Sequence, residues 1–187
     1  MEQYSKRKPN RLEYYDYTSN GAYFITICVK DRKCILSRIS VGADIIRPYQ
    51  VLLTRNGQIV DKAICSVPSH YDNVSVDHYV IMPNHVHLLL RIENGSGQII
   101  SASTESEACG RIISAPTDAE IGGRVISVST VIGSLKRIVS KELGYSVWQK
   151  SYYDHVIRDE RDYQIRWQYI ENNPAKWAQD EYYTEDK

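Results

Sequence analysis

Two histidines separated by one residue, His85 and His87, are the first candidates for chemistry in this chain. Side chains alternate along a β-strand, so residues i and i+2 point to the same face. Two imidazoles placed in this way can converge on a divalent cation, while Val86 points to the opposite face. Ordinary polar residues on an exposed strand are the simpler interpretation of so short a motif. The surrounding segment 82–90 favours the metal pair, because both histidines begin a strongly hydrophobic strand.

A tyrosine and an asparagine four residues apart, Tyr169 and Asn173, form the second candidate group. On a helix this spacing places both side chains on one face, so a phenol and an amide carbonyl can approach the same ion. A surface tyrosine followed by an Asn-Pro pair that ends the helix is the alternative. Residue statistics alone favour that alternative.

Hydrophobic periodicity predicts the elements that must position these residues. Strands are expected at 22–29, 74–82, 85–92 and 153–157, with weaker strand-like pieces within 34–53. Helices are expected from a Thr54 cap to about residue 66, where Pro68 stops the helix, from Val131 to a Gly144 cap, and over 160–171.

The order of these elements predicts an α+β fold. Strand, helix, strand, strand, helix, strand, helix is the split βαβ, ferredoxin-like or RRM-like pattern with an additional terminal helix. It implies an antiparallel sheet with helices on one face and a C-terminal helix that carries Tyr169. In this topology the strand 85–92 lies in the middle of the sheet.

A short repeat interrupts this order. Related six-residue segments recur at 97–102, 110–115 and 123–128, each 13 residues after the last. Three copies of so small a unit cannot build a solenoid core. We therefore expect one domain over 1–187 with a flexible, repeat-containing insertion at about 93–129.

Composition excludes several classes of protein. The 187 residues include 23 Lys+Arg and 23 Asp+Glu, and this neutrality argues against a generally basic nucleic-acid binder, although local basic patches remain possible. The four cysteines form no CxxC pair, so neither a zinc ribbon nor a thioredoxin-like site is expected. The basic N-terminal segment 2–11 lacks the apolar region of a signal peptide, and no apolar run is long enough to cross a bilayer. We therefore expect a cytoplasmic protein, associated with the nucleoid when bound to DNA.

Four sequence blocks together resemble a known family. They are 21–27, 79–90, 147–158 and 169–174, and they occur in the family's order over roughly 10–178 outside the insertion. They look like the single-tyrosine HUH transposases of the insertion-sequence-200 type. The Trp-Gln and Tyr-Asp-His-Val-Ile-Arg block and the Asn-Pro ending resemble the REP-associated tyrosine transposases in particular.

The resemblance implies a role for each motif residue. His85 and His87 match the HUH pair, Tyr169 matches the nucleophile, and Asn173 matches the polar helix residue that completes the site. A Mg²⁺ or Mn²⁺ ion would then polarise a scissile phosphate. The implied reaction cleaves and rejoins single-stranded DNA that contains hairpin or palindromic repeats, through a 5′-phosphotyrosine, by a monomer or a homodimer.

Further residues are candidates for contact with DNA, by stacking or through phosphates. Sheet packing and solvated charge explain them equally well, and for the basic helix stripe the solvated face is the default. The candidates are Tyr152, Tyr153, His155 and Arg158 before the last helix, and Lys136, Arg137 and Lys141 on the helix after the insertion.

Two other functions remain open. One is a domesticated nucleic-acid-binding domain on the same fold without cleavage activity. The other is an unrelated metal hydrolase built on His85 and His87, which requires a carboxylate ligand that the sequence does not identify.

Overall fold

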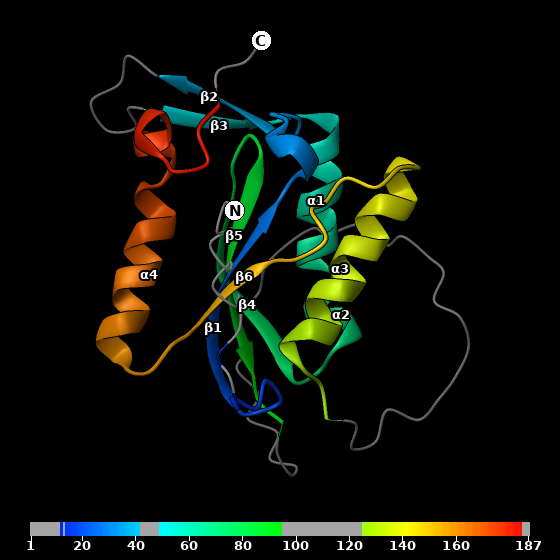
Figure 1. The fold of residues 1–187 in the computed structure, drawn as a ribbon, viewed down its shortest axis with the longest axis vertical. Coiled ribbons are helices and arrows are strands. Elements are labelled where there is room, and N and C mark those ends of the chain that lie inside the picture. The colour runs from blue at the N-terminus through cyan, green and yellow to red at the C-terminus, as the bar shows by residue number, and fades with distance from the viewer. Residues whose placement is uncertain (1–11, 13, 42–48, 95–124, 185–187) are drawn as a thin grey trace, which may run out of the picture.

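The computed structural model describes residues 12, 14–41, 49–94 and 125–184 (Figure 1). The strands are β1 (Gly21–Cys28), β2 (Ser37–Val41), β3 (Tyr49–Leu53), β4 (Val74–Ile81), β5 (His85–Ile92) and β6 (Tyr153–Val156). The helices are α1 (Arg55–Cys65), α2 (Val67–His70), α3 (Val128–Leu143) and α4 (Glu160–Asn172), with short 3₁₀ segments η1 (Lys30–Arg32) and η2 (Pro174–Gln179). None of the helices in these ranges is long and apolar enough to cross a membrane.

The main sheet is antiparallel and has the strand order β4-β5-β1-β6. The predicted ferredoxin-like α+β fold is therefore confirmed, and the strand that carries both histidines is central as expected. Residues Thr26 and Cys28 of β1 lie opposite His87 and His85. The strands β2 and β3 pair separately as a hairpin, in the region where only weak strand signals were expected.

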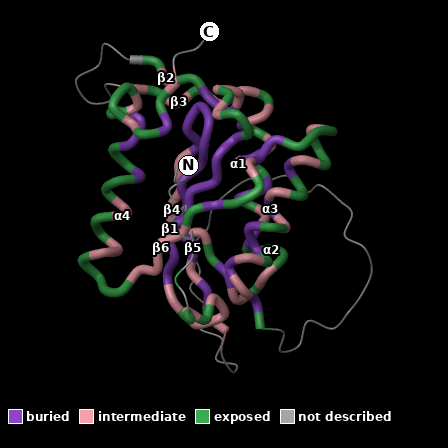
Figure 2. The backbone as a smooth tube through the Cα atoms, viewed as in Figure 1, coloured by how far each residue is buried: buried purple, intermediate pink, exposed green. Residues whose placement is uncertain are grey.

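Helices cover both faces of the main sheet (Figures 1 and 2). The main core includes Val86, Leu88 and Leu90 and is closed by residues of α1 and α3. On the opposite face, Phe24 and Leu89 pack against Ile170 of α4, in a smaller cluster. The side-chain alternation predicted for β5 is therefore confirmed, and α4 lies on the face toward which both histidines point.

The helix ends largely follow their sequence signals. Thr54 caps α1 by accepting a hydrogen bond from the Gly57 backbone N–H at 3.2 Å, and Gly144 caps α3 in the left-handed region with φ 77. Pro68 differs from its expected role. It lies in the first turn of α2, where its missing N–H costs no helix hydrogen bond, and α1 has already ended at Cys65.

Asn94 joins the two chain segments that flank residues 95–124. These 30 residues make up most of the expected insertion and lie outside the described residues. Its amide nitrogen donates to the carbonyl oxygens of Thr18 and Ile126, each at 2.7 Å. Its oxygen accepts from the Ile126 backbone N–H at 3.0 Å. The end of β5 is thereby tied directly to the chain that enters α3.

Candidate active site

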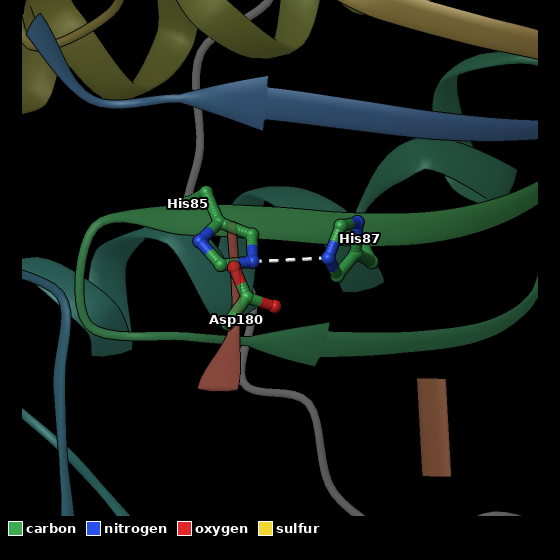
Figure 3. A group of neighbouring side chains, drawn as sticks. All are labelled: His85, His87 and Asp180. Carbon is green, nitrogen blue, oxygen red and sulfur yellow. Dashed lines mark hydrogen bonds between the residues drawn. The ribbon is translucent and has the colours of Figure 1, made fainter. Parts of the chain in front are cut away.

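His85 and His87 form a buried pair with a carboxylate beside it (Figure 3). The imidazoles are 0% and 1% exposed, and their Nε2 atoms are 2.9 Å apart. Asp180 follows η2 and brings a carboxylate oxygen to the pair. One ligand atom from each of the three residues lies within 4.8 Å of the other two, so the cluster can hold a metal ion.

Two neighbouring side chains orient the imidazoles. Asn84 directs its Nδ2 to the Tyr182 carbonyl at 2.7 Å, which leaves its Oδ1 to accept from His85 Nδ1 at 2.9 Å. His87 Nδ1 lies 2.9 Å from the hydroxyl oxygen of Thr26. When Nδ1 carries the proton in both rings, both Nε2 lone pairs face the cluster, which is the arrangement that metal-binding histidines require.

Burial keeps both imidazoles neutral. It lowers the pKa of His85 to about 4, although the nearby Asp180 carboxylate acts in the opposite direction. Burial also lowers the pKa of His87 well below its usual value, and His85 adds to this effect. Both rings therefore offer a lone pair at neutral pH without first losing a proton.

Asn173 lies at the end of α4, beside the carboxylate. Its side chain is buried and its Nδ2 donates to Asp180 Oδ2 at 2.9 Å. Its Oδ1 is buried and has no hydrogen-bond partner within the described part of the chain. Two neutral imidazoles and a carboxylate form a donor set that fits a divalent cation such as Mg²⁺ or Mn²⁺, and the Asn173 amide adjoins this set through the carboxylate.

Tyr169 lies on α4 above the histidine pair. Its ring centroid is 5.1 Å from that of His87, and the residue is 37% exposed. Burial raises the pKa of the phenol, and the carboxylates of Asp180 and Glu181 raise it further, whereas Asn173 acts to lower it. The phenol is therefore protonated at neutral pH, beside the candidate metal ligands.

Comparison with known proteins places the chain in a family. No protein-family model matches it. An uncharacterized protein of Haemophilus influenzae is 33% identical over 179 residues, which cover 96% of this chain and 94% of that protein. The chain belongs to the same family as this Haemophilus protein.

One solved structure identifies the fold. The structure of a REP-associated tyrosine transposase bound to a REP hairpin superposes with a TM-score of 0.54 and 20% identity, over 89% of this chain and 74% of that one. The fold is that of a REP-associated tyrosine transposase. A candidate transposase from Deinococcus radiodurans gives a TM-score of 0.40 and 16% identity, over 87% of this chain and 95% of that one.

Part of the segment before α4 faces the histidines. Tyr153 and His155 of β6 line a cavity of about 340 Å³ beside the site. Tyr152 is buried in the main core, where its hydroxyl lies 3.2 Å from that of Ser129. Arg158 is exposed beyond the end of β6. The structure thus brings Tyr153 and His155 to the candidate site, but not Tyr152.

The basic residues of α3 lie on the other side of the main sheet. Lys136 donates to the backbone carbonyls of Gln149 and Ser151, at 3.0 and 2.7 Å. Arg137 and Lys141 are exposed. Since α3 packs against the face opposite to the histidines, none of these three cations adjoins the candidate site.

The sequence interpretation missed several residues of the site. Asp180 stands in an acidic tail, and its spacing of seven residues from Asn173 is not a recognised ligand pattern. Asn84 directly precedes the histidine pair but has no spacing that marks it as a partner of His85, and Thr26 is one of seven threonines. The useful signal for Thr26 is the pairing register of β1 with β5, which places it opposite His87.

Proposed function

We propose that this protein is a metal-dependent DNA transposase of the single-tyrosine type, which cleaves and rejoins single-stranded DNA. One observation carries the proposal. The Tyr169 ring lies 5.1 Å from the ring of His87, whose Nε2 belongs to the cluster completed by His85 and Asp180. A nucleophile and a candidate cation site that adjoin in this way suit phosphoryl transfer to a protein side chain.

Each residue has a role in this proposal. The oxygen of Tyr169 attacks the scissile phosphorus, the bond to the 3′ oxygen breaks, and the products are a 5′-phosphotyrosine and a free 3′-hydroxyl. The phenol proton leaves and the 3′ oxygen gains a proton, so no water is consumed and the strand can be rejoined by the reverse step. His85, His87, Asp180 and Asn173 would hold the divalent cation, which supplies Lewis-acid polarisation of the phosphate.

The proposed substrate is DNA with a hairpin and unpaired flanks. The support is the similarity in fold to a transposase that was solved with a REP hairpin bound. The zero net charge of the chain argues against indiscriminate duplex binding, which depends on an excess of Lys and Arg, and is compatible with recognition of a structured single strand.

The decisive experiment follows the covalent adduct. Hairpin DNA with labelled, unpaired flanks is incubated with the protein and Mn²⁺, and the products are separated by denaturing electrophoresis. The wild-type protein is expected to form a protein–DNA adduct that EDTA prevents. Tyr169→Phe, which removes only the phenol oxygen, is expected to abolish the adduct and to retain DNA binding. Tyr145→Phe, at an exposed tyrosine beyond the end of α3, is the matched control and should form the adduct normally.

Adduct formation by Tyr169→Phe contradicts the proposed nucleophile. DNA binding without any adduct in the wild-type protein supports the domesticated binding domain instead.

A metal hydrolase is the second candidate, and Asp180 favours it, because this residue supplies the carboxylate that the sequence alone did not identify. Two histidines and a carboxylate can activate a water molecule on a bound cation. Loss of phosphodiester cleavage in His85→Ala, together with full cleavage in Tyr169→Phe, distinguishes this hydrolase from the transposase.

A further inference from the structure

A cavity of about 340 Å³ opens beside the candidate metal centre, over β1 and β6. Two of the residues that line the cavity, Phe24 and Tyr182, also contact the histidines. The Phe24 ring stacks on that of His87 with centroids 5.2 Å apart, and the Tyr182 ring lies 4.7 Å from that of His85. A group bound in this cavity would therefore be the immediate neighbour of a phosphate at the metal centre.

Arg32 supplies a fixed positive charge to the cavity. Its guanidinium lies 5.0 Å from the centroid of the Tyr182 ring, and Nη1 donates to the Glu181 carbonyl at 2.9 Å. Asn84 holds the Arg32 carbonyl at 3.2 Å. Arg32 forms no salt bridge with any described carboxylate. A positioned guanidinium without a carboxylate partner is suited to bind a phosphate.

Aromatic rings supply the remaining apolar surface. Tyr153 is 45% exposed on the edge strand, and its ring centroid is 6.5 Å from that of Tyr182. The Arg166 guanidinium lies 5.4 Å from the Phe24 ring and is paired with Asp162 at 3.5 Å. Tyr153 is thus an exposed ring of the cavity, whereas the guanidinium groups lie over the buried rings of Tyr182 and Phe24. An exposed ring on which a base can stack, together with positive charge for the backbone, is the usual combination in sites that hold single-stranded nucleic acid without reading its sequence.

We propose that this cavity holds one unpaired nucleotide of the DNA, directly next to the scissile phosphate. The base stacks on Tyr153, and Arg32 binds the phosphate of that nucleotide. The volume is at the small end of the range for ligand sites, so it suits a single nucleotide and not a base pair. This inference rests on the proposed function, because it extends the same site to its substrate.

A chemical double-mutant cycle tests the stacking contact. Binding of a hairpin oligonucleotide to the Tyr169→Phe protein is measured while an abasic site is moved through the unpaired flanks, one nucleotide at a time. At one position, the abasic site is expected to weaken binding by about 5- to 150-fold. Tyr153→Ala should weaken binding of intact DNA similarly, and the abasic site at that position should then add less than about twofold, because both changes remove one interaction.

The phosphate contact is tested by salt dependence. Arg32→Gln keeps a donor for the Glu181 carbonyl but removes the charge. The slope of log affinity against log salt concentration should fall by about 0.7, the value for one single-strand phosphate contact. The matched control is Arg55→Gln, at an exposed arginine at the start of α1, and it should leave the slope unchanged.

Two results overturn the nucleotide site. One is a loss of binding on introducing the abasic site that is, at every position, as large with Tyr153→Ala as without it. The other is an unchanged salt slope in Arg32→Gln. Either result can occur while the wild-type protein still forms the Tyr169 adduct. Conversely, coupling between Tyr153 and one nucleotide without any adduct would reject the transposase proposal and retain the nucleotide site.

Discussion

Replacing Asn84 by alanine tests whether the histidine pair depends on its neighbours. Asn84 is 1% exposed and spans two parts of the site. Its Oδ1 accepts from His85 Nδ1, and its Nδ2 donates to the Tyr182 carbonyl. In Asn84→Ala, the His85 ring loses the contact that sets its proton on Nδ1, and the carbonyl of Tyr182 loses its donor.

The structure sets the scale of two separate effects. An unsatisfied buried donor or acceptor costs about 1–3 kcal/mol, so the two lost contacts predict a stability decrease of about 2–6 kcal/mol. Loss of an outer partner of a metal-binding histidine typically lowers metal affinity by about 10- to 100-fold. Asn84→Asp separates these effects, since it keeps an acceptor for His85 but loses the donor to Tyr182. It should retain most of the metal affinity and still lose stability.

Two measurements on the same proteins check this prediction. Calorimetric titration with Mn²⁺ gives the metal affinity, and urea denaturation in EDTA gives the free energy of unfolding. The reasoning fails if Asn84→Ala binds Mn²⁺ as tightly as the wild-type protein. It also fails if Asn84→Asp loses as much affinity as Asn84→Ala, because the acceptor would then be irrelevant.

Two further predictions concern the free energy of unfolding, measured without metal. Because the pKa of His85 falls to about 4 on folding from a usual value near 6.5, the unfolded chain binds more protons between these values. The free energy of unfolding should therefore rise with pH across this window, by up to about 1.4 kcal/mol per pH unit. Urea denaturation should show a shallower rise in His85→Gln. A rise that is unchanged in this variant contradicts the lowered pKa of His85. A Cβ at Gly57 in α1 would overlap the backbone carbonyl of Leu36, whereas a Cβ at Gly133 in α3 would meet nothing within 4 Å. Gly57→Ala should lower the free energy of unfolding by about 1–3 kcal/mol. Gly133→Ala should raise it by about 0.5–1 kcal/mol. Equal effects of the two substitutions would rule out the overlap of a Gly57 Cβ with the Leu36 carbonyl.

Periodicity was sufficient to predict most of the fold, because local residue patterns determine local structure. The alternation in β5 predicted which residues face the core, and Thr54 and Gly144 marked helix ends through backbone hydrogen bonding and a left-handed conformation. Pro68 was misinterpreted because proline prevents a helix from continuing through it but is tolerated where a new helix begins. The hairpin of β2 and β3 gave only weak signals, since its pairing depends on contacts between separate segments.

The candidate site was only partly predictable, because its residues meet through tertiary packing. The sequence identified His85 and His87 through their spacing on one strand. No sequence pattern marks Asp180, because this residue approaches the histidines only where the chain turns back after α4 through η2. Likewise, a basic stripe containing Lys136 can be recognised in the sequence, but the face of the sheet that it occupies cannot.

The contacts of Asn94 have a consequence for how this protein can change over evolutionary time. One side chain bridges the chain before residue 95 and the chain at Ile126, so β5 and α3 keep their positions whatever length of polypeptide connects them. Lengthening such a connection costs only about 0.6 kcal/mol for each doubling. A duplication of 13 residues inserted between these two points is therefore expected to leave the relative positions of β5 and α3 unchanged. Two copies of the repeat, 97–102 and 110–115, lie between Asn94 and Ile126, where such lengthening is tolerated, and the third, 123–128, ends at the first residue of α3.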